Sequence, residues 1–322
     1  MNNRLVTILK NIISSLLCFF QFNTIYSYLS VKEDKLCILV YHNFRSREKF
    51  SNHIRIYKDK GEIISLDRAV RIIKRKKLFE SKFVITFDDG YSSLCSLLKS
   101  AGKIDLPVTI FLSTHYVDNQ KLFWWDKYSF LNKKSRYLRF NSLVRQILRQ
   151  HPQEKRESYE KIIFNFMQKI LTFPAKEDLE MYRVLNWEEI KRLSERGVKF
   201  GAHSHMHFIL TELQASNTKK DLILNKKKIY QNLNISDIPF AYPGGFYDNG
   251  IARLVEDLEF SSALTTDYGF NSTSSDLFKL KRIGIDETDW VSTVNVKISG
   301  LWGEILYKFI PNFINKIKNE SA

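Results

Sequence analysis

The stretch Phe83-Val84-Ile85-Thr86-Phe87-Asp88-Asp89-Gly90 decides the fold, because it is a short apolar run that closes on two carboxylates and a glycine. Such a run, bounded by turn residues, predicts a strand in the core of a sheet. Similar runs recur along the chain, and together the predicted strands are 36–41, 62–66, 83–88, 108–113, 198–204, 239–243 and 262–266. Their alternation with helical patterns predicts an α/β fold with parallel strands, and seven strands favour a barrel over an open sheet.

Helices are predicted between most of these strands, among them 67–77, 187–196 and 213–233. Asn186 precedes the second of these helices, and Glu189 follows three residues later, which is typical of a capping box. The segment 117–185 has helical patterns but no clear strand, so we expect a helical insertion within one domain of residues 36–290.

The terminal segments, 1–35 and 291–322, both carry apolar residues at helical spacing. In the first segment these are Leu5, Ile8, Leu9, Ile12, Ile13, Leu16, Leu17 and Phe20, and in the second Trp302, Ile305, Leu306, Phe309, Phe313 and Ile317. Lys10, Asn11 and Ser14 interrupt the first apolar run before it is long enough to span a bilayer. We expect amphipathic helices that pack on the domain or lie on a membrane, with packing slightly favoured and an N-terminal anchor as an open alternative. No convincing cleavage site for export follows, so we expect a cytoplasmic protein, peripheral at the inner face of the membrane.

The composition restricts the partners only partly. The chain has 50 Lys and Arg against 35 Asp and Glu, a net charge of +15, which favours anionic membranes, phosphorylated substrates or nucleic acid. Basic and aromatic residues interleave in 133–183, but their helical spacing is more typical of solvated helix faces, so no nucleic-acid partner is expected. The cysteines, Cys18, Cys37 and Cys95, are too few and too far apart for a disulfide framework or a cysteine metal site.

Chemistry is indicated by three of the chain's seven histidines, which stand within five residues at His203, His205 and His207. In βα folds the carboxyl ends of the strands gather functional residues, so these histidines should meet Asp88 and Asp89 at one edge. Either group alone is more often structural, since Asp-Asp-Gly favours tight turns. Their convergence favours a metal site. Two histidines and one carboxylate leave coordination positions for water and substrate, and the second carboxylate is then free to act as a base.

On these motifs the chain resembles the polysaccharide deacetylases of carbohydrate esterase family 4, the NodB-homology enzymes, over about residues 36–285. Thr86-Phe87-Asp88-Asp89-Gly90 is nearly the family's first motif, and His203-Ser204-x-x-His207 matches its histidine motif. The resemblance implies a distorted (β/α) barrel in which Asp89, His203 and His207 bind a divalent metal, usually Zn²⁺, and Asp88 is the base. His205 falls at a variable position, and we expect it in the pocket wall or beside the ligands rather than on the metal.

The third family motif is changed in this chain. Phe240-Ala241-Tyr242-Pro243-Gly244-Gly245 has Ala241 where the family commonly has an arginine, so the base is expected to lack its usual clamp. By the resemblance, the backbone N–H of Gly244 stabilises the oxyanion, and Tyr242 is a candidate for substrate binding. The Pro-Gly-Gly run is a tight turn in either case.

No histidine follows His207, although many family members take their general acid from a C-terminal histidine. Val40-Tyr41-His42 resembles the Tyr-His of the subgroup typified by poly-N-acetylglucosamine deacetylases, which makes His42 the candidate acid; a histidine bonded into the structure is the alternative. Trp124 and Trp125, in a run that recurs in this subgroup, are candidates for stacking on a sugar, or for a hydrophobic hinge. Asp286 and Asp289-Trp290 resemble a fourth motif only loosely.

The expected function is that of a metal-dependent hydrolase that removes N-acetyl groups from amino sugars of a bacterial surface polysaccharide or its lipid-linked precursor. The partners implied are this glycan and a membrane surface. An O-deacetylase or deformylase on the same scaffold is one alternative, because the same attack by water serves esters and formamides. A glycan-binding protein without catalysis is the other, suggested by Ala241 and the unusual acid.

Overall fold

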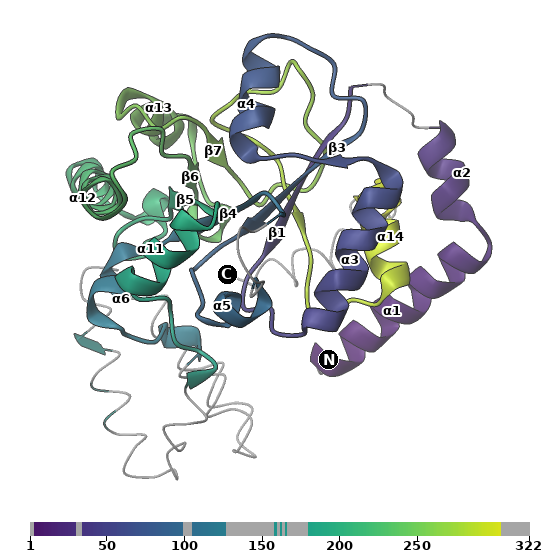
Figure 1. Cartoon of the computed structure of the whole chain (residues 1–322), viewed down its shortest axis with the longest axis horizontal. Coiled ribbons are helices and arrows are strands. Elements are labelled where there is room, and N and C mark those ends of the chain that lie inside the picture. Colours follow the sequence, from purple (N-terminus) through teal and green to yellow (C-terminus); the bar gives the residue numbers. More distant parts are fainter. Residues whose placement is uncertain are drawn as a thin grey trace.

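In the computed structural model, residues 3–29, 34–98, 105–126, 158–159, 162, 165 and 180–303 are described. A curled parallel sheet lies between layers of helices, and the two N-terminal helices lie at the outer edge of the molecule (Figure 1). In chain order the elements are α1 Asn3–Phe19, α2 Phe22–Leu29, β1 Leu36–Tyr41, α3 Arg47–Lys60, β2 Glu62–Ile63, α4 Leu66–Lys74, β3 Lys82–Phe87, α5 Ser93–Leu97, β4 Val108–Leu112, α6 Thr114–Asn119, α11 Trp187–Glu195, β5 Lys199–Ala202, 3₁₀ helix η2 Leu210–Glu212, α12 Ala215–Leu233, β6 Phe240–Ala241, 3₁₀ helix η3 Pro243–Gly245, α13 Asn249–Asp257, β7 Ala263–Leu264, β8 Ile283–Gly284 and α14 Val291–Ser299.

The strands form one parallel sheet in the order β7-β6-β5-β4-β3-β1-β8, with β2 paired to the start of β3. The sheet curls toward closure because residues 280–284 contact both of its ends. Leu280 forms a parallel bridge with Leu264 of β7, and β8 pairs with Leu39 and Val40 of β1. This is the distorted (β/α) barrel that the sequence predicts.

Every predicted strand is present, but several are shorter than expected. The predicted strand 62–66 ends at Ile63, because Ser65 caps α4 by accepting a hydrogen bond from the backbone N–H of Arg68. β8 was not predicted, because two residues are too short a run to give a pattern. The capping box at Asn186 and Glu189 is confirmed, with both reciprocal hydrogen bonds present.

The central strands are buried on both faces, as parallel strands covered by helices must be. β1 is buried along its whole length, and so are β4 and most of β3. In-register pairing sets Tyr41 at the end of β1 beside Phe87 at the end of β3. The residues that follow these two strands therefore leave the sheet at the same edge.

Helix α1 packs against α14 with its polar face, not with the apolar face that the sequence predicts. Its inward stripe is polar, with Asn11 and Ser14 buried, whereas Ile12, Leu16 and Phe19 are exposed. The expectation that its apolar stripe packs on the domain is therefore wrong: hydrogen bonds and ion pairs to residues 286–293 fix the polar face inward.

Among the helices that the structure describes, none is long and apolar enough to cross a membrane. Most of the expected insertion 117–185 and the apolar stripe after Gly303 lie outside the described residues. The cysteines Cys18, Cys37 and Cys95 are all free.

Candidate active site

The two carboxylates leave β3 at its buried end. Asp88 continues the strand direction, and its backbone N–H donates to the carbonyl of Tyr41 (2.9 Å). Asp89 and Gly90 then both adopt left-handed conformations, with φ of 69° and 68°. Such a conformation is unfavourable for a residue with a Cβ, and it interrupts the alternation of a strand, in which neighbouring side chains point to opposite faces. Asp89 can therefore share one site with Asp88.

The histidines approach these carboxylates from the neighbouring part of the sheet. His203 Nε2 lies 4.0 Å from Asp88 Oδ2 and 3.7 Å from Asp89 Oδ1. His207 Nε2 lies 3.3 Å from the same Asp89 oxygen, and the two imidazole centroids are 4.8 Å apart. Both histidines and both carboxylates therefore converge, as the sequence predicts.

The tautomer of His203 is fixed by the third motif. Its Nδ1 is 2.7 Å from the carbonyl oxygen of Ala241, and a carbonyl only accepts, so Nδ1 carries the proton. Burial lowers the pKa of His203 to about 4, so the ring is neutral at pH 7. Its Nε2 lone pair is consequently available to a metal ion, in the arrangement common for ligating histidines.

Asp89, His203 and His207 fit a divalent ion. In the described part of the chain, one ligand atom from each of these residues lies within 4.8 Å of the others. Asp89 Oδ1 is buried and makes no hydrogen bond. A buried carboxylate oxygen without a partner is costly, and a metal ion beside it would remove that cost. Two imidazoles and a carboxylate are a donor set typical of catalytic zinc.

Asp88 is clamped by an arginine that the sequence analysis missed. Arg282 is fully buried, and its two terminal nitrogens each donate to one Asp88 oxygen at 2.7 Å. Its Nε donates to the carbonyl of Thr265 (2.7 Å), which fixes the plane of the guanidinium. Burial alone would raise the pKa of the Asp88 carboxyl, but Arg282 and His203 outweigh it and hold the pKa well below its usual range.

The expectation that the base lacks a clamp is therefore wrong. Arg282 precedes β8, whose residues close the sheet between β7 and β1, so its side chain enters the barrel from a different strand than position 241. The sequence gives little signal for this arginine, because it directly follows Lys281 and its partner lies 194 residues away.

His42 follows β1 at the same edge of the sheet and is exposed. Its charge would lower the pKa of both Asp88 and Asp89. The part of His42 as the acid stays a prediction.

The histidine between the two candidate ligands points elsewhere. His205 Nδ1 is 2.8 Å from the hydroxyl of Thr114, and its ring packs edge-on against His115. Its backbone N–H and that of Met206 donate to the buried carboxylate of Asp221, which shapes the loop. Asp221 was not singled out from the sequence, because its role depends on contacts 15 and 16 residues away.

Trp125 forms part of the site wall. Its ring lies 4.7 Å from that of His207, and its Nε1 donates to the hydroxyl of Tyr91 (3.1 Å). That hydroxyl in turn donates to Asp126 (2.7 Å), whose pKa burial raises to about 7. Trp124 packs edge-on against Trp125 and is partly exposed. No pattern in the sequence links Tyr91 to Asp126, so their contact was not predicted.

Two candidates for substrate contact differ in their outcome. Tyr242 is fully buried, and its hydroxyl donates to the carbonyl of Phe278 (2.9 Å), so the interpretation of this ring as a substrate contact is wrong. Gly244 is exposed in a turn with φ of 62°, directly after Pro243. The following residue, Gly245, must also be glycine, because a Cβ there would lie 1.8 Å from Thr266 Oγ1.

The loosely matched fourth motif makes its contacts with α1 and α14. Asp289 is buried and forms ion pairs with Lys10 of α1 and with Lys297 of α14. Asp286 lies 3.6 Å from Lys10 and 3.7 Å from Lys297. These contacts give both carboxylates a structural part, which is to join α1 and α14 to the barrel.

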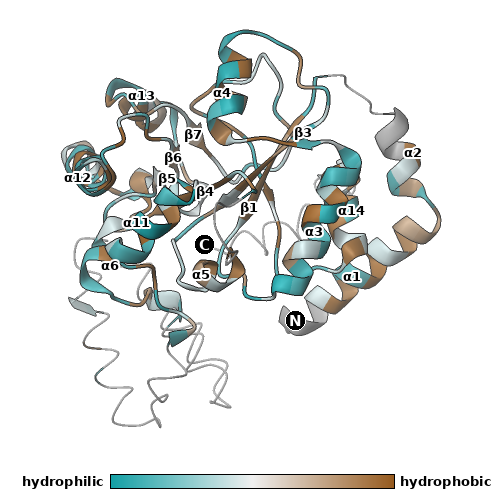
Figure 2. Ribbon diagram, viewed as in Figure 1, coloured by the Kyte–Doolittle hydropathy of each residue, from teal (hydrophilic) through white to brown (hydrophobic). Residues whose placement is uncertain are grey.

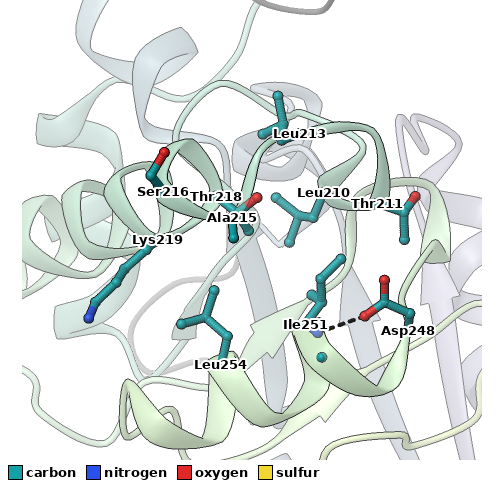
Figure 3. A pocket seen from close by; sticks show the side chains of 11 residues that line it. Leu210, Thr211, Leu213, Ala215, Ser216, Thr218, Lys219, Asp248, Ile251 and Leu254 are labelled. Atoms are coloured by element: carbon teal, nitrogen blue, oxygen red, sulfur yellow. Dashed lines mark hydrogen bonds between the residues drawn. The ribbon is translucent and has the colours of Figure 1, made fainter.

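A separate cavity of about 520 Å³ opens between the start of α12 and α13 (Figure 3). Its lining is mainly apolar, with Leu210, Leu213, Ile251 and Leu254 pointing toward one another in the close view. None of the metal-cluster residues lines it.

The comparisons with known proteins concern the chain's family and fold. The family described as polysaccharide deacetylase matches residues 75–263, which is more than half of the chain. This chain belongs to the polysaccharide deacetylase family. It is accordingly a hydrolase of the polysaccharide deacetylase class.

Solved structures share the deacetylase fold at low sequence identity. IcaB from Ammonifex degensii is 17% identical with a TM-score of 0.55, over 82% of this chain and 97% of that one. The Streptococcus pyogenes deacetylase PplD, solved with acetate, is 18% identical with a TM-score of 0.52, over 80% and 94%. The de-N-acetylase from Aggregatibacter actinomycetemcomitans is 12% identical with a TM-score of 0.52, over 81% and 98%. No curated protein sequence matches the chain.

Proposed function

We propose that this deacetylase is metal-dependent and that Asp89, His203 and His207 bind the ion. Zn²⁺ is the divalent ion that we propose. The observation that carries the proposal is the unpartnered, buried Oδ1 of Asp89, which faces two imidazole nitrogens at 3.3 and 3.7 Å. When bound, a divalent ion would polarise the acetyl carbonyl and acidify a water molecule.

The residues around the cluster divide the remaining chemistry. Asp88, kept ionised by Arg282, accepts a proton from the attacking water. The backbone N–H of Gly244 donates to the oxygen of the acetyl group as negative charge develops on it. His42 gives a proton to the departing amine, so that the products are free acetate and an amino sugar.

The proposed substrate is an N-acetylated amino sugar in a bacterial surface polysaccharide or its lipid-linked precursor. Trp125, which is partly exposed beside His207, is the candidate for stacking on a sugar ring, and Trp124 stands next to it. The side of the membrane on which the enzyme works stays a prediction from the sequence, which fractionation of cells tests directly.

Acetate release from N-acetylated oligosaccharides and lipid-linked sugars, measured with zinc-loaded protein, tests the proposal. Asp88→Asn should abolish release and retain the metal, because Asp88 is not in the ligand group; Asp276→Asn, at an exposed position, is the matched control. Release without a free amine would instead indicate an O-deacetylase. Full activity in Asp88→Asn would show that Asp88 is not the base.

The alternative of a glycan-binding protein without catalysis loses its main support, because Arg282 supplies the clamp that Ala241 lacks.

A further inference from the structure

The outer surface of α1 and the start of α2 is apolar. Nine of the 18 exposed large apolar side chains in the described part of the chain lie between Ile8 and Ile25. The most exposed of them is Phe19, at 80%, and Phe20 and Leu16 follow at 59% and 54%. Figure 2 shows hydrophobic residues along α1, at the outer edge of the molecule. We call this surface, from Ile8 to Ile25, the α1 apolar face.

Specific polar contacts fix which side of α1 faces the protein. Asn11 donates from Nδ2 to the carbonyl of Thr288, and its Oδ1 accepts from the hydroxyl of Thr293. One turn further on, Ser15 hydrogen-bonds to Ser292, and Cys18 Sγ donates to the carbonyl of Ser292. Lys10 pairs with the buried Asp289. The helix is therefore held with its polar stripe inward.

In water an amphipathic helix is normally stabilised by packing its apolar stripe on the core. Here the apolar stripe is outside, so the helix gains its remaining stabilisation only if something apolar covers that stripe. Exposed apolar patches of this kind mark interaction sites on proteins or membranes.

The charge around the α1 apolar face favours a bilayer. The first 32 residues contain no Asp or Glu, and the whole chain carries a net charge of +15. Three phenylalanines at the junction of α1 and α2, and an exposed indole at Trp290 beside Asn11, are aromatic rings of the type that gather at membrane interfaces. An apolar helix face flanked by aromatic rings, on a chain of net positive charge, suits the interface of an anionic bilayer.

We propose that the α1 apolar face docks the enzyme on an anionic phospholipid bilayer, with α1 lying along the surface and the barrel outside it. The docking needs no catalysis and does not rest on the proposed function.

Contacts link this surface to the edge of the sheet that carries the active site. Lys10 of α1 binds the segment that follows β8, and Glu287 of that segment accepts hydrogen bonds from the backbone N–H groups of Arg45 and Ser46. These two residues follow His42 closely in the chain. Docking through α1 therefore brings this edge near the lipid headgroups, where a lipid-linked glycan would be presented; this consequence does rest on the proposed function.

Flotation of the full chain with vesicles of phosphatidylcholine, with and without phosphatidylglycerol, tests the docking. The protein should bind the anionic vesicles, and Leu16→Ser/Phe19→Ser/Phe20→Ser should bind at least ~100-fold more weakly, as the loss of three buried apolar side chains implies. The matched control, Leu78→Ser/Ile223→Ser/Leu224→Ser, removes side chains that are exposed elsewhere and should bind like the wild type. A single change, Phe19→Glu, repeats the test should the triple variant fold poorly.

Equal vesicle binding by the wild type and the α1 variants, or no binding by the wild type, would overturn the proposal. So would sedimentation of the lipid-free protein as a dimer that the triple variant dissociates, since a second copy would then cover the face. Thiol labelling of Phe22→Cys in a Cys18→Ser background should be fast without lipid. Protection of this thiol in the monomer would show that other residues of the same chain cover the α1 apolar face, and would also overturn the proposal. Asp88→Asn should bind vesicles like the wild type, which separates failure of docking from failure of the proposed chemistry.

Discussion

Replacement of Arg282 by methionine tests the clamp on Asp88, because it removes the guanidinium and keeps an unbranched apolar side chain in its place. Both partners of this ion pair are almost fully buried, with side-chain exposures of 0% and 2%. Asp88 would then be left in the barrel without the two hydrogen bonds of 2.7 Å that it now accepts.

The cost follows from the burial. Removal of one partner from a buried, bidentate ion pair leaves an uncompensated charge, which typically costs about 3–5 kcal/mol of folding stability. Part of this cost is avoided if Asp88 takes up a proton, but a protonated Asp88 cannot act as a base. Arg282→Met should therefore lose both stability and turnover. Arg282→Lys keeps the charge but not the planar fork of the guanidinium. Its stability and turnover should lie between those of the wild type and those of Arg282→Met.

Urea unfolding of Arg282→Met, Asp88→Asn and the double variant measures the coupling between the two side chains. The double variant should be less destabilised than the sum of the single variants, by at least about 1 kcal/mol, because it leaves no unpaired charge. Acetate release, followed in parallel, should fall by at least ~100-fold in Arg282→Met, the order expected when a base is no longer held in place. Additive free energies with unchanged turnover would refute the clamp.

Three further predictions concern single positions. His205→Ala should retain bound zinc while His203→Ala and His207→Ala lose it, measured by metal analysis of the purified proteins; loss of zinc in all three would place His205 among the ligands. Asp126→Asn should change the pH dependence of stability in metal-free protein. Burial raises the pKa of Asp126 to about 7, so between about pH 4 and 7 the folded wild type holds a proton that the unfolded chain releases. The folding stability of the wild type should therefore fall by up to ~4 kcal/mol as the pH rises through that range. Thermal melts across that range should show a smaller loss in Asp126→Asn, and parallel curves would contradict this. Gly245→Ala should cost about 1–3 kcal/mol, because its φ is 75° and a Cβ would overlap Thr266, whereas Gly284→Ala, which meets nothing within 4 Å, should be nearly neutral; equal melting points would be the contrary result.

The sequence predicts those parts of the site that are local in the chain. Asp88 and Asp89 end one apolar run, and His203 and His207 follow another, so the rule that strand ends share an edge was enough to bring them together. The barrel followed from the same alternation of strands and helices.

Contacts over long sequence separations could not be predicted. Arg282 binds Asp88 across 194 residues, and Tyr91 binds Asp126 across 35, and neither pair has a pattern that links its members. Tyr242 was assigned to the substrate because it belongs to the third motif, yet its side chain turns into the core. Position along the chain gives no information on this direction.

The outcome at α1 has a different cause. Helical spacing correctly separates an apolar from a polar stripe, but it does not decide which stripe faces the protein. Asn11 and Ser15 find hydrogen-bonding partners on residues 288–293, which the periodicity of the first helix alone does not reveal.

The central claim is that Asp89, His203 and His207 hold the metal ion on which deacetylation depends. Its most direct test is the acetate released from an N-acetylated oligosaccharide by metal-stripped protein, before and after titration with Zn²⁺. We predict negligible release from the stripped enzyme and recovery at one zinc per chain, with no recovery in Asp89→Ala. Undiminished release from the stripped enzyme, or zinc-dependent recovery in Asp89→Ala, would contradict the claim.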